Sequence, residues 1–157
     1  MADMMIQLST AADWIRQSSS ILIAAGAGLS ATAINPQYGV GLDYTSVAAF
    51  RRLYPRMTQV STMRCMYDAI GKRDWTSELM WGYLFTHVDK CRFNWGATSV
   101  YQDLKQILTY KPTDSFVITT NADGMFEQNN FVSIDLVDER ENDVFLLGYD
   151  SFSQYTR

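Results

Sequence analysis

The sequence contains few of the residues that build metal sites and disulfide frameworks. It has one histidine and two cysteines, Cys65 and Cys91, and it has no C-x-x-C pair. A four-ligand zinc site needs closely spaced cysteines or histidines, and a disulfide framework needs several cysteine pairs. We therefore expect no metal site, and we expect both cysteines to be buried, reduced thiols.

Long apolar runs are also missing. No run approaches the roughly 20 residues that a membrane helix needs, and residues 1–10 lack the basic start and long apolar stretch of a secretory signal. These absences predict a cytoplasmic protein that does not enter a membrane. Because the hydrophobic fraction is 47%, well above that of disordered chains, we expect a single folded domain over residues 1–157.

Clustered positive charge is the third absence. The net charge is −4, and the basic residues between positions 51 and 73 are scattered through expected helices, away from any interleaved aromatic patch. Domains that bind nucleic acid carry a basic patch or stripe. The sequence therefore predicts no nucleic-acid partner.

What the sequence does contain is two short apolar runs, at 21–25 and 116–120. A continuous run with branched residues is typical of a strand that is covered on both faces, as in a parallel sheet flanked by helices. Before the first run, Thr10 and Asp13 have the spacing of a capping box, which predicts a helix over about residues 10–18.

A helical region separates the two runs. Residues 35–45 predict an irregular loop, because they hold Pro36, Gly39 and Gly41 and no clear period. Apolar residues then recur at helical spacing over 46–54, 57–70, 74–87 and 98–110. We therefore expect an α/β fold with a partial, Rossmann-like parallel sheet and a helical insertion at about 46–111. A short helix over 124–128 and strands near 132–136 and 144–147 should follow.

The first apolar run ends in Gly26-Ala27-Gly28-Leu29-Ser30-Ala31, which fits the pattern G-x-G-x-x-A. Glycines at the turn let the backbone approach a pyrophosphate, and amide groups at the start of a helix bind its charge. The alternative interpretation is a tight turn without a ligand. An ordinary dehydrogenase is disfavoured, because Asp43 lies in a loop and not at a second strand end.

The second run ends in Thr119-Thr120-Asn121-Ala122-Asp123-Gly124. Open α/β sheets bind ligands at the carboxyl ends of their strands, so the Asn121 amide and the Asp123 carboxylate are candidate ligand-binding groups. Taken alone, the same residues are also typical of a plain turn. The two motifs together favour a binding site.

At this point the sequence resembles the sirtuins. Residues 25–30 are similar to the G-A-G-x-S dinucleotide loop of that family, and residues 119–125 are similar to its T-x-N-x-D-x-L segment. The middle of the chain, with M-Y-D-A-I-G, W-G-Y-L-F and R-F-N-W, is closer to the microbial branch that is encoded beside macrodomains. The resemblance covers about residues 10–131.

The resemblance implies NAD or ADP-ribose as the ligand, with a protein as the possible acceptor substrate. It implies that the diphosphate and the adjoining ribose of NAD contact Gly26, Ala27, Gly28 and Ser30. It also implies that Asn121 faces the nicotinamide ribose, that Asp123 binds the nicotinamide amide, and that these two residues serve catalysis. The macrodomain-linked branch transfers ADP-ribose to protein, whereas other sirtuins remove acyl groups from lysine.

The chain departs from the sirtuin pattern in its last part. Phe126 stands where family members carry a histidine, and residues 132–157 contain neither an H-G nor a Q-G pair to supply the general base. The later segments of the sirtuin core are also absent, so the resemblance predicts a truncated chain with a divergent tail. Whether the protein is an enzyme stays open.

Two alternatives follow from these departures. One is a catalytically inactive, truncated sirtuin that binds a nucleotide or a partner protein, and the other is an unrelated nucleotide-binding protein. We expect His87 to be structural. We also expect the aromatic side chains between positions 75 and 95 to form the core of the helical region rather than an acceptor pocket.

Overall fold

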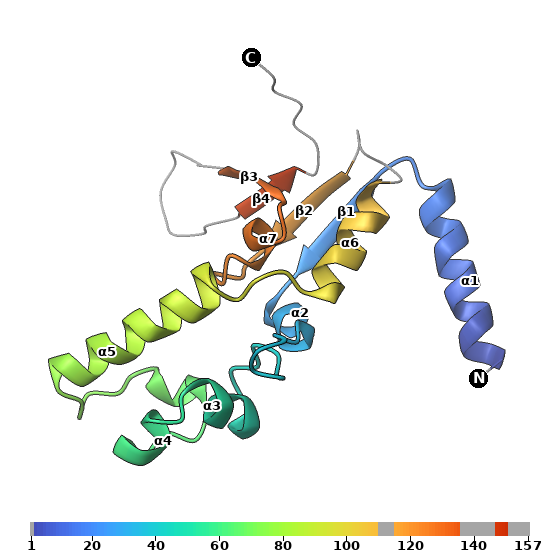
Figure 1. The fold of residues 1–157 in the computed structure, drawn as a ribbon. Coiled ribbons are helices and arrows are strands. Elements are labelled where there is room, and N and C mark those ends of the chain that lie inside the picture. The colour runs from blue at the N-terminus through green and yellow to red at the C-terminus, as the bar shows by residue number, and fades with distance from the viewer. Residues whose placement is uncertain (1, 110–114, 136–146, 151–157) are drawn as a thin grey trace.

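The protein is described here by a computed structural model, which covers residues 2–109, 115–135 and 147–150 (Figure 1). A four-stranded sheet with the order β1-β2-β4-β3 lies at its centre. The strands are β1 (Ile21–Ala25), β2 (Ser115–Thr119), β3 (Val132–Asp135) and β4 (Leu147–Asp150).

The sheet is mixed, so the parallel arrangement that the sequence predicts is found for β1 and β2 alone among the described strands. β1 and β2 are parallel, but β4 is antiparallel to both β2 and β3. A parallel pair needs a long crossover, and the helices between β1 and β2 supply one, whereas an antiparallel pair such as β3 and β4 needs no crossover. The α/β class is confirmed. Of the strand expected at 144–147, residues 144–146 lie outside the described residues, and only Leu147 falls in β4.

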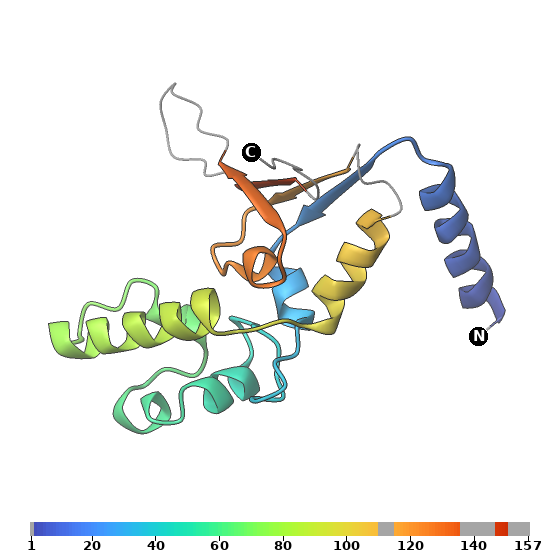
Figure 2. The same ribbon diagram turned by 45° about the horizontal axis from the view of Figure 1, so that its top comes forward.

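Most of the helices lie between β1 and β2 in the sequence, as expected for a helical insertion. The helices and helical turns are α1 (Ala2–Gln17), α2 (Ala27–Thr32), α3 (Val47–Leu53), α4 (Met57–Val60), the 3-10 turn η1 (Met66–Ala69), α5 (Ser77–Val88), the π-helical turn η2 (Asp89–Phe93), α6 (Ser99–Thr109) and α7 (Met125–Gln128). The helices α3, α4 and α5 project from the sheet on one side of the molecule (Figures 1 and 2). Within the described residues, no helix is both long enough and apolar enough to cross a membrane.

The single helix predicted over residues 57–70 is wrong. α4 ends at Val60, and η1 begins only at Met66. The backbone becomes extended at Ser61, whose N–H and hydroxyl both donate to the Met57 carbonyl, at 3.1 Å and 2.7 Å. Serine side chains compete in this way with the backbone hydrogen bonds of a helix.

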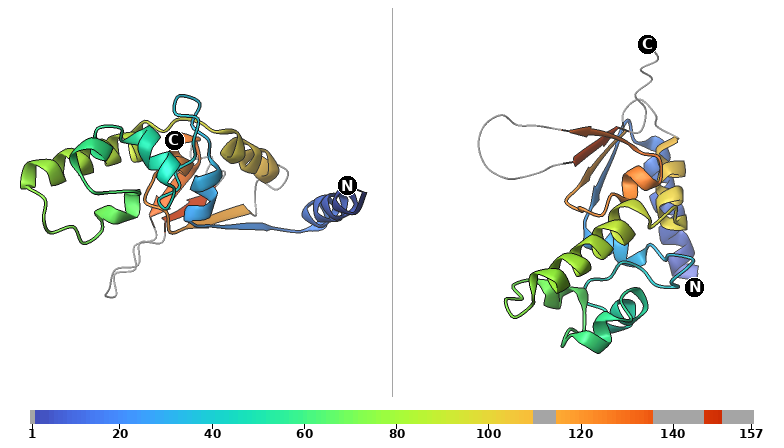
Figure 3. Two further views of the ribbon diagram at one scale, coloured as in Figure 1. Left: turned by 90° about the horizontal axis from the view of Figure 1, so that it is seen from below. Right: turned by 60° about the vertical axis from the view of Figure 1, so that its left-hand side comes forward.

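α1 also differs from its prediction. It begins at Ala2, so Thr10 and Asp13 lie inside the helix and form no capping box. The Thr10 hydroxyl donates to the Ile6 carbonyl at 2.9 Å, and Asp13 pairs with Arg16 at 2.6 Å. The helix stands apart from the rest of the molecule (Figures 1 and 3), and the Trp14 side chain is 71% exposed.

Only one face of β1 is covered, although its apolar sequence predicts burial on both. The side chains of Ile21, Ile23 and Ala25 pack against the core, whereas Leu22 is 64% exposed. The core beside this sheet comes from α6, β2 and α7, with Tyr101, Leu108, Val117, Met125 and Phe126 all buried. The described helices therefore cover one side of the strand.

The loop after α2 is held close to that helix. Leu42 donates its backbone N–H to the Ser30 carbonyl at 2.9 Å. A methyl group on Gly41 would overlap the Ala31 carbonyl oxygen, so only glycine allows this approach. Farther along the loop, the Asn35 amide donates to the Trp95 carbonyl at 2.7 Å and ties the loop to the helical region.

Candidate functional site

The two motifs lie at one edge of the sheet, as the sequence predicts. β1 and β2 are parallel and Ala25 pairs with Thr119, so both strands end at the same level. Thr120 donates its backbone N–H to the Ala25 carbonyl at 3.4 Å, which continues the contact beyond the strands. The glycine turn after β1 and the Asn121–Gly124 segment after β2 therefore begin side by side.

Asn121 joins the two motifs directly. Its side-chain amide donates to the Gly26 carbonyl at 2.9 Å and to the Ser30 hydroxyl oxygen at 3.0 Å. Its backbone N–H donates to the Thr119 hydroxyl at 3.1 Å, and the residue is only 9% exposed. One side chain thus sets the spacing between the ends of β1 and β2.

Asp123 makes the second link between the motifs. The Ser30 hydroxyl donates to Asp123 Oδ2 at 2.5 Å, and the Met125 N–H donates to Oδ1 at 3.1 Å. Burial raises the pKa of the Asp123 carboxyl, and the hydrogen bonds from Ser30 and Met125 oppose that increase. The carboxylate is therefore held inside the protein in a site that disfavours its charge.

Tyr101 belongs to the same cluster, although no sequence motif points to it. This α6 residue is fully buried, and its hydroxyl lies 3.2 Å from Ser30 Oγ. Burial raises the pKa of Tyr101 to about 12. Because Ser30 gives its single proton to Asp123, the Tyr101 hydroxyl is the donor to Ser30. In sequence, Tyr101 is simply one member of a helical apolar pattern, which carries no information about its hydroxyl.

All hydrogen-bonding positions of the Ser30 hydroxyl are therefore occupied by groups of the protein. It donates to Asp123 and accepts from Asn121 and Tyr101, and the residue has no exposed surface. The sequence predicts that Ser30 contacts a diphosphate. The structure places its side chain behind the glycine turn, where it organises the other polar groups.

The glycine turn itself is open to solvent. Gly26, Ala27 and Gly28 are exposed, and α2 begins at Ala27. A methyl group added to Gly26 or Gly28 would meet no protein atom within 4 Å. The backbone at these two positions is thus accessible to a ligand, whereas packing against the protein does not require glycine there.

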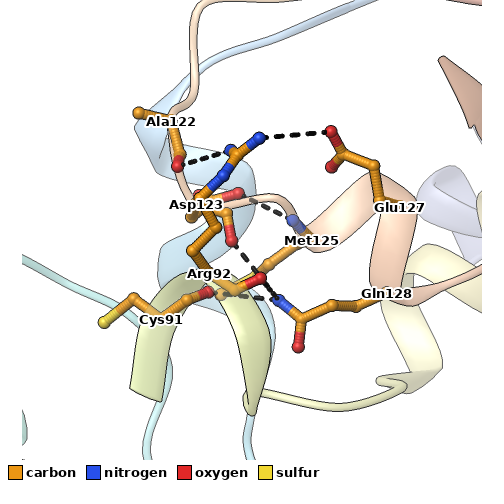
Figure 4. A network of polar contacts seen from close by, with 7 residues as sticks. All are labelled: Cys91, Arg92, Ala122, Asp123, Met125, Glu127 and Gln128. Atoms are coloured by element: carbon orange, nitrogen blue, oxygen red, sulfur yellow. Dashed lines mark hydrogen bonds and ion pairs between the residues drawn. The ribbon is translucent and has the colours of Figure 1, made fainter. Parts of the chain in front are cut away.

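The helical region reaches this site through Arg92 (Figure 4). The Arg92 guanidinium donates to the Ala122 carbonyl at 2.9 Å and lies 3.7 Å from Glu127 Oε1. Gly124 has a φ of 63°, and a methyl group there would lie 3.0 Å from the Arg92 carbonyl oxygen. The end of η2 therefore packs closely on the segment that carries Asp123.

His87 is packed in a separate aromatic cluster. Its Nδ1 lies 2.7 Å from the Tyr54 hydroxyl, its Nε2 lies 3.3 Å from the Tyr44 hydroxyl, and the Tyr83 ring stacks on it. Burial lowers the pKa of His87, so the imidazole is neutral at pH 7. These contacts suit the structural role that the sequence predicts.

The other sequence-based expectations have mixed outcomes. Cys91 is buried as expected, but Cys65 is only half-buried. Of the aromatic side chains assigned to the core, Trp81, Phe85 and Phe93 are more than half exposed. Among the described residues, no group of three or more histidine, cysteine or acidic side chains is placed to hold a metal.

A groove of about 530 Å³ separates α5 from α3 and α4. Its floor is mainly apolar, from Leu53, Met57, Leu79 and Tyr83, and Lys90 lies at its wall. None of the strand-end residues lines it. The groove is therefore distinct from the polar cluster around Ser30.

The fold and the site define an α/β protein with a buried polar cluster where two parallel strands end beside an exposed glycine turn. Over 125 residues, or 79% of its length, the chain is 39% identical to a protein of Fusarium oxysporum f. sp. cubense named "Probable bifunctional ADP-ribose hydrolase/ADP-ribosyltransferase". The matched residues span 19% of that protein, so the chain corresponds to about one fifth of its length. No protein-family model matches the chain, and no solved structure does.

Proposed function

We propose that this protein is a sirtuin-like NAD-binding protein of the protein ADP-ribosyltransferase branch. The observation that carries the proposal is the Asn121 side chain, which bonds to Gly26 and Ser30 and so unites the glycine turn with the Asn121–Asp123 segment. The similarity to a fungal protein named for ADP-ribose chemistry supports the same interpretation. The acceptor would be a protein side chain.

The exposed turn fits a nucleotide diphosphate. Gly26 and Gly28 leave open space where any side chain would project, and a pyrophosphate needs such access to the backbone. In this proposal Gly26, Ala27 and Gly28 hold the diphosphate. Ser30 contributes by fixing Asn121 and Asp123 rather than by touching the phosphates.

NAD would supply a nicotinamide–ribose bond, whose cleavage develops positive charge on the ribose. The protein contributes position and electrostatics. Asn121 would face the nicotinamide ribose and Asp123 the nicotinamide amide, both held by bonds to groups of the protein that are already in place. In this proposal Asp123 orients the nicotinamide amide, and the fixed Asn121 amide lies beside the ribose on which the charge develops.

A specific observation supports a second function, which is nucleotide binding without cleavage. Asn121 and Asp123 already have hydrogen-bond partners within the protein, and the single histidine is occupied in the aromatic cluster with Tyr44 and Tyr54. The chain would then bind ADP-ribose or a partner without turnover. This alternative corresponds to the catalytically inactive protein, binding a nucleotide or a partner, that the sequence also allows.

Release of nicotinamide from NAD tests the two functions. The purified protein is incubated with NAD, with and without a protein acceptor, and nicotinamide is measured by chromatography. We expect release that is lost in Asn121→Ala and kept in the surface control Asn94→Ala. Release that survives in Asn121→Ala would reject the proposed site. ADP-ribose binding by calorimetry without any nicotinamide release would favour the binding function.

A further inference from the structure

The segment that carries Asp123 is held in place by the end of the helical region. η2 follows α5 directly and ends at Phe93, and its closing bond runs from the Asn94 N–H to the Asp89 carbonyl at 2.9 Å. The last carbonyls of a helix have no partner inside the helix and must find one elsewhere. In this protein the partner is the side chain of Gln128.

Gln128 connects three segments through one amide (Figure 4). Its Nε2 lies 3.2 Å from the carbonyl oxygen of Cys91, 2.9 Å from that of Arg92 and 3.3 Å from that of Asp123, and its two N–H groups are shared among them. Its Oε1 accepts the Gly96 N–H at 2.8 Å. Gln128 sits on α7, so a single side chain joins α7, the end of η2 and the backbone of Asp123.

Arg92 supplies a second link to this segment, because its guanidinium donates to the Ala122 carbonyl at 2.9 Å, but its ion pair with Glu127 adds little. Arg92 and Glu127 are separated by 3.7 Å, and their side chains are 38% and 32% exposed. Exposed ion pairs contribute little, because solvent screens the charges. The half-buried amide of Gln128 contacts three backbone carbonyls, and removing a donor from such groups is costly where water cannot replace it.

We propose that Gln128 is a positioning residue, which fixes the Asn121–Gly124 segment against η2 and thereby couples the helical region to the ligand site. It acts through the backbone of Asp123 and does not touch the ligand. The expected effect of Gln128 on ligand affinity rests on the proposed function. Its expected effect on the order of the Asn121–Gly124 segment does not.

The test replaces Gln128 by methionine, which has a similar shape and lacks both the donors and the acceptor. We expect amide hydrogen exchange over residues 121–125 to accelerate about tenfold or more, with β1 unchanged, and the affinity for ADP-ribose to fall about tenfold. Gln106→Met makes the same change at an exposed position of α6 and should alter neither quantity. Unchanged exchange over 121–125 in Gln128→Met would overturn the proposal.

Gln128→Glu supplies a second readout that a general loss of packing would not give. At neutral pH its carboxylate can donate to none of the three carbonyl oxygens and lies beside the charges of Arg92 and Glu127, whereas the protonated acid regains one donor. We expect the ratio of its exchange rate to that of the wild type to fall towards unity as the pH is lowered from about 7.5 to about 5. A constant ratio would overturn the role of the donors, even if Gln128→Met fails to fold.

The outcomes for the two proposals are distinguishable. If the wild type binds neither NAD nor ADP-ribose but Gln128→Met still accelerates exchange over 121–125, the proposed function fails and the positioning role stands. If the wild type binds ADP-ribose and Gln128→Met keeps both its affinity and its protection, the positioning role fails and the proposed function stands.

Discussion

A side chain at Gly28 should affect the stability of the fold and the affinity for a ligand in opposite directions. A methyl group there would meet no protein atom, and alanine is favoured over glycine in a helix such as α2 by about 1 kcal/mol. Gly28→Ala should therefore leave the melting temperature unchanged or raise it. If the turn holds a diphosphate, the methyl group should weaken ADP-ribose binding about tenfold. Calorimetry and thermal unfolding of the same sample measure both, and unaltered affinity would contradict the assignment of this turn.

The buried carboxyl of Asp123 makes the stability of the protein depend on pH. Burial raises the pKa of this carboxyl above its ordinary value of 3.8, so the folded state holds the proton more tightly than the unfolded state. This difference in pKa stabilises the folded state fully at a pH below the unfolded-state pKa. The stabilisation is lost as the pH rises through the folded-state pKa. An asparagine side chain at this position does not titrate, so it would lose no stability as the pH rises. Its amide oxygen could still accept the Met125 N–H, and its amide nitrogen would lie beside the Ser30 hydroxyl.

Asp123→Asn should therefore gain stability relative to the wild type as the pH rises. Urea unfolding between about pH 3 and about pH 7 measures the difference between the two free energies of unfolding, which we expect to grow through the titration and then level off. A difference that does not depend on pH would show that this carboxyl is not perturbed by folding.

The residues of the site were only partly predictable from the sequence. Asn121 and Asp123 follow a recognisable strand, and a parallel pair must bring its carboxyl ends to one edge of the sheet. Tyr101 and Gln128 were missed because each acts through a contact that is distant in sequence. The contact of Ser30 with a ligand stays a prediction. Its hydroxyl bonds to three neighbouring side chains, and local sequence does not indicate which side chains will surround a residue.

At the scale of elements, the exposure of each β1 side chain determines how much its removal lowers the free energy of unfolding. Leu22 is 64% exposed, whereas Leu108 of α6 is fully buried. Leu22→Ala should change the free energy of unfolding by no more than about 0.5 kcal/mol, whereas Leu108→Ala should cost about 2–5 kcal/mol. Urea unfolding of the pair checks this. A large loss for Leu22→Ala would mean that its outer face is covered in solution.

Comparison of predicted and observed bounds shows which elements sequence patterns can predict. The strands β1 and β2 and the helices α6 and α7 lie close to their predicted bounds, because each combines a clear period with nearby breaking residues. The pattern over residues 57–70 failed because apolar spacing does not reveal that the backbone becomes extended at Ser61, where α4 ends. The direction of β4 also depends on its neighbours in the sheet, which its own residues do not encode.

At the scale of the whole molecule, Trp95 joins the helical region to the segment after α2. It is 2% exposed, and its indole N–H donates to the Ala33 carbonyl at 3.0 Å. Trp95→Phe keeps an aromatic ring but leaves that carbonyl without its donor, which should cost roughly 1–3 kcal/mol. Trp81→Phe is the matched control, because Trp81 is 57% exposed. Equal melting temperatures for the two variants would contradict this role of Trp95.

The close approach at Gly41 also has a consequence for how this protein can evolve. Any side chain there would collide with the Ala31 backbone, whereas Gly26 and Gly28 face open space. Selection for folding alone would preserve glycine at position 41 and let positions 26 and 28 drift. Selection for a bound nucleotide would preserve all three. The pattern of glycine loss among descendants of this gene would therefore record whether the ligand site is still in use.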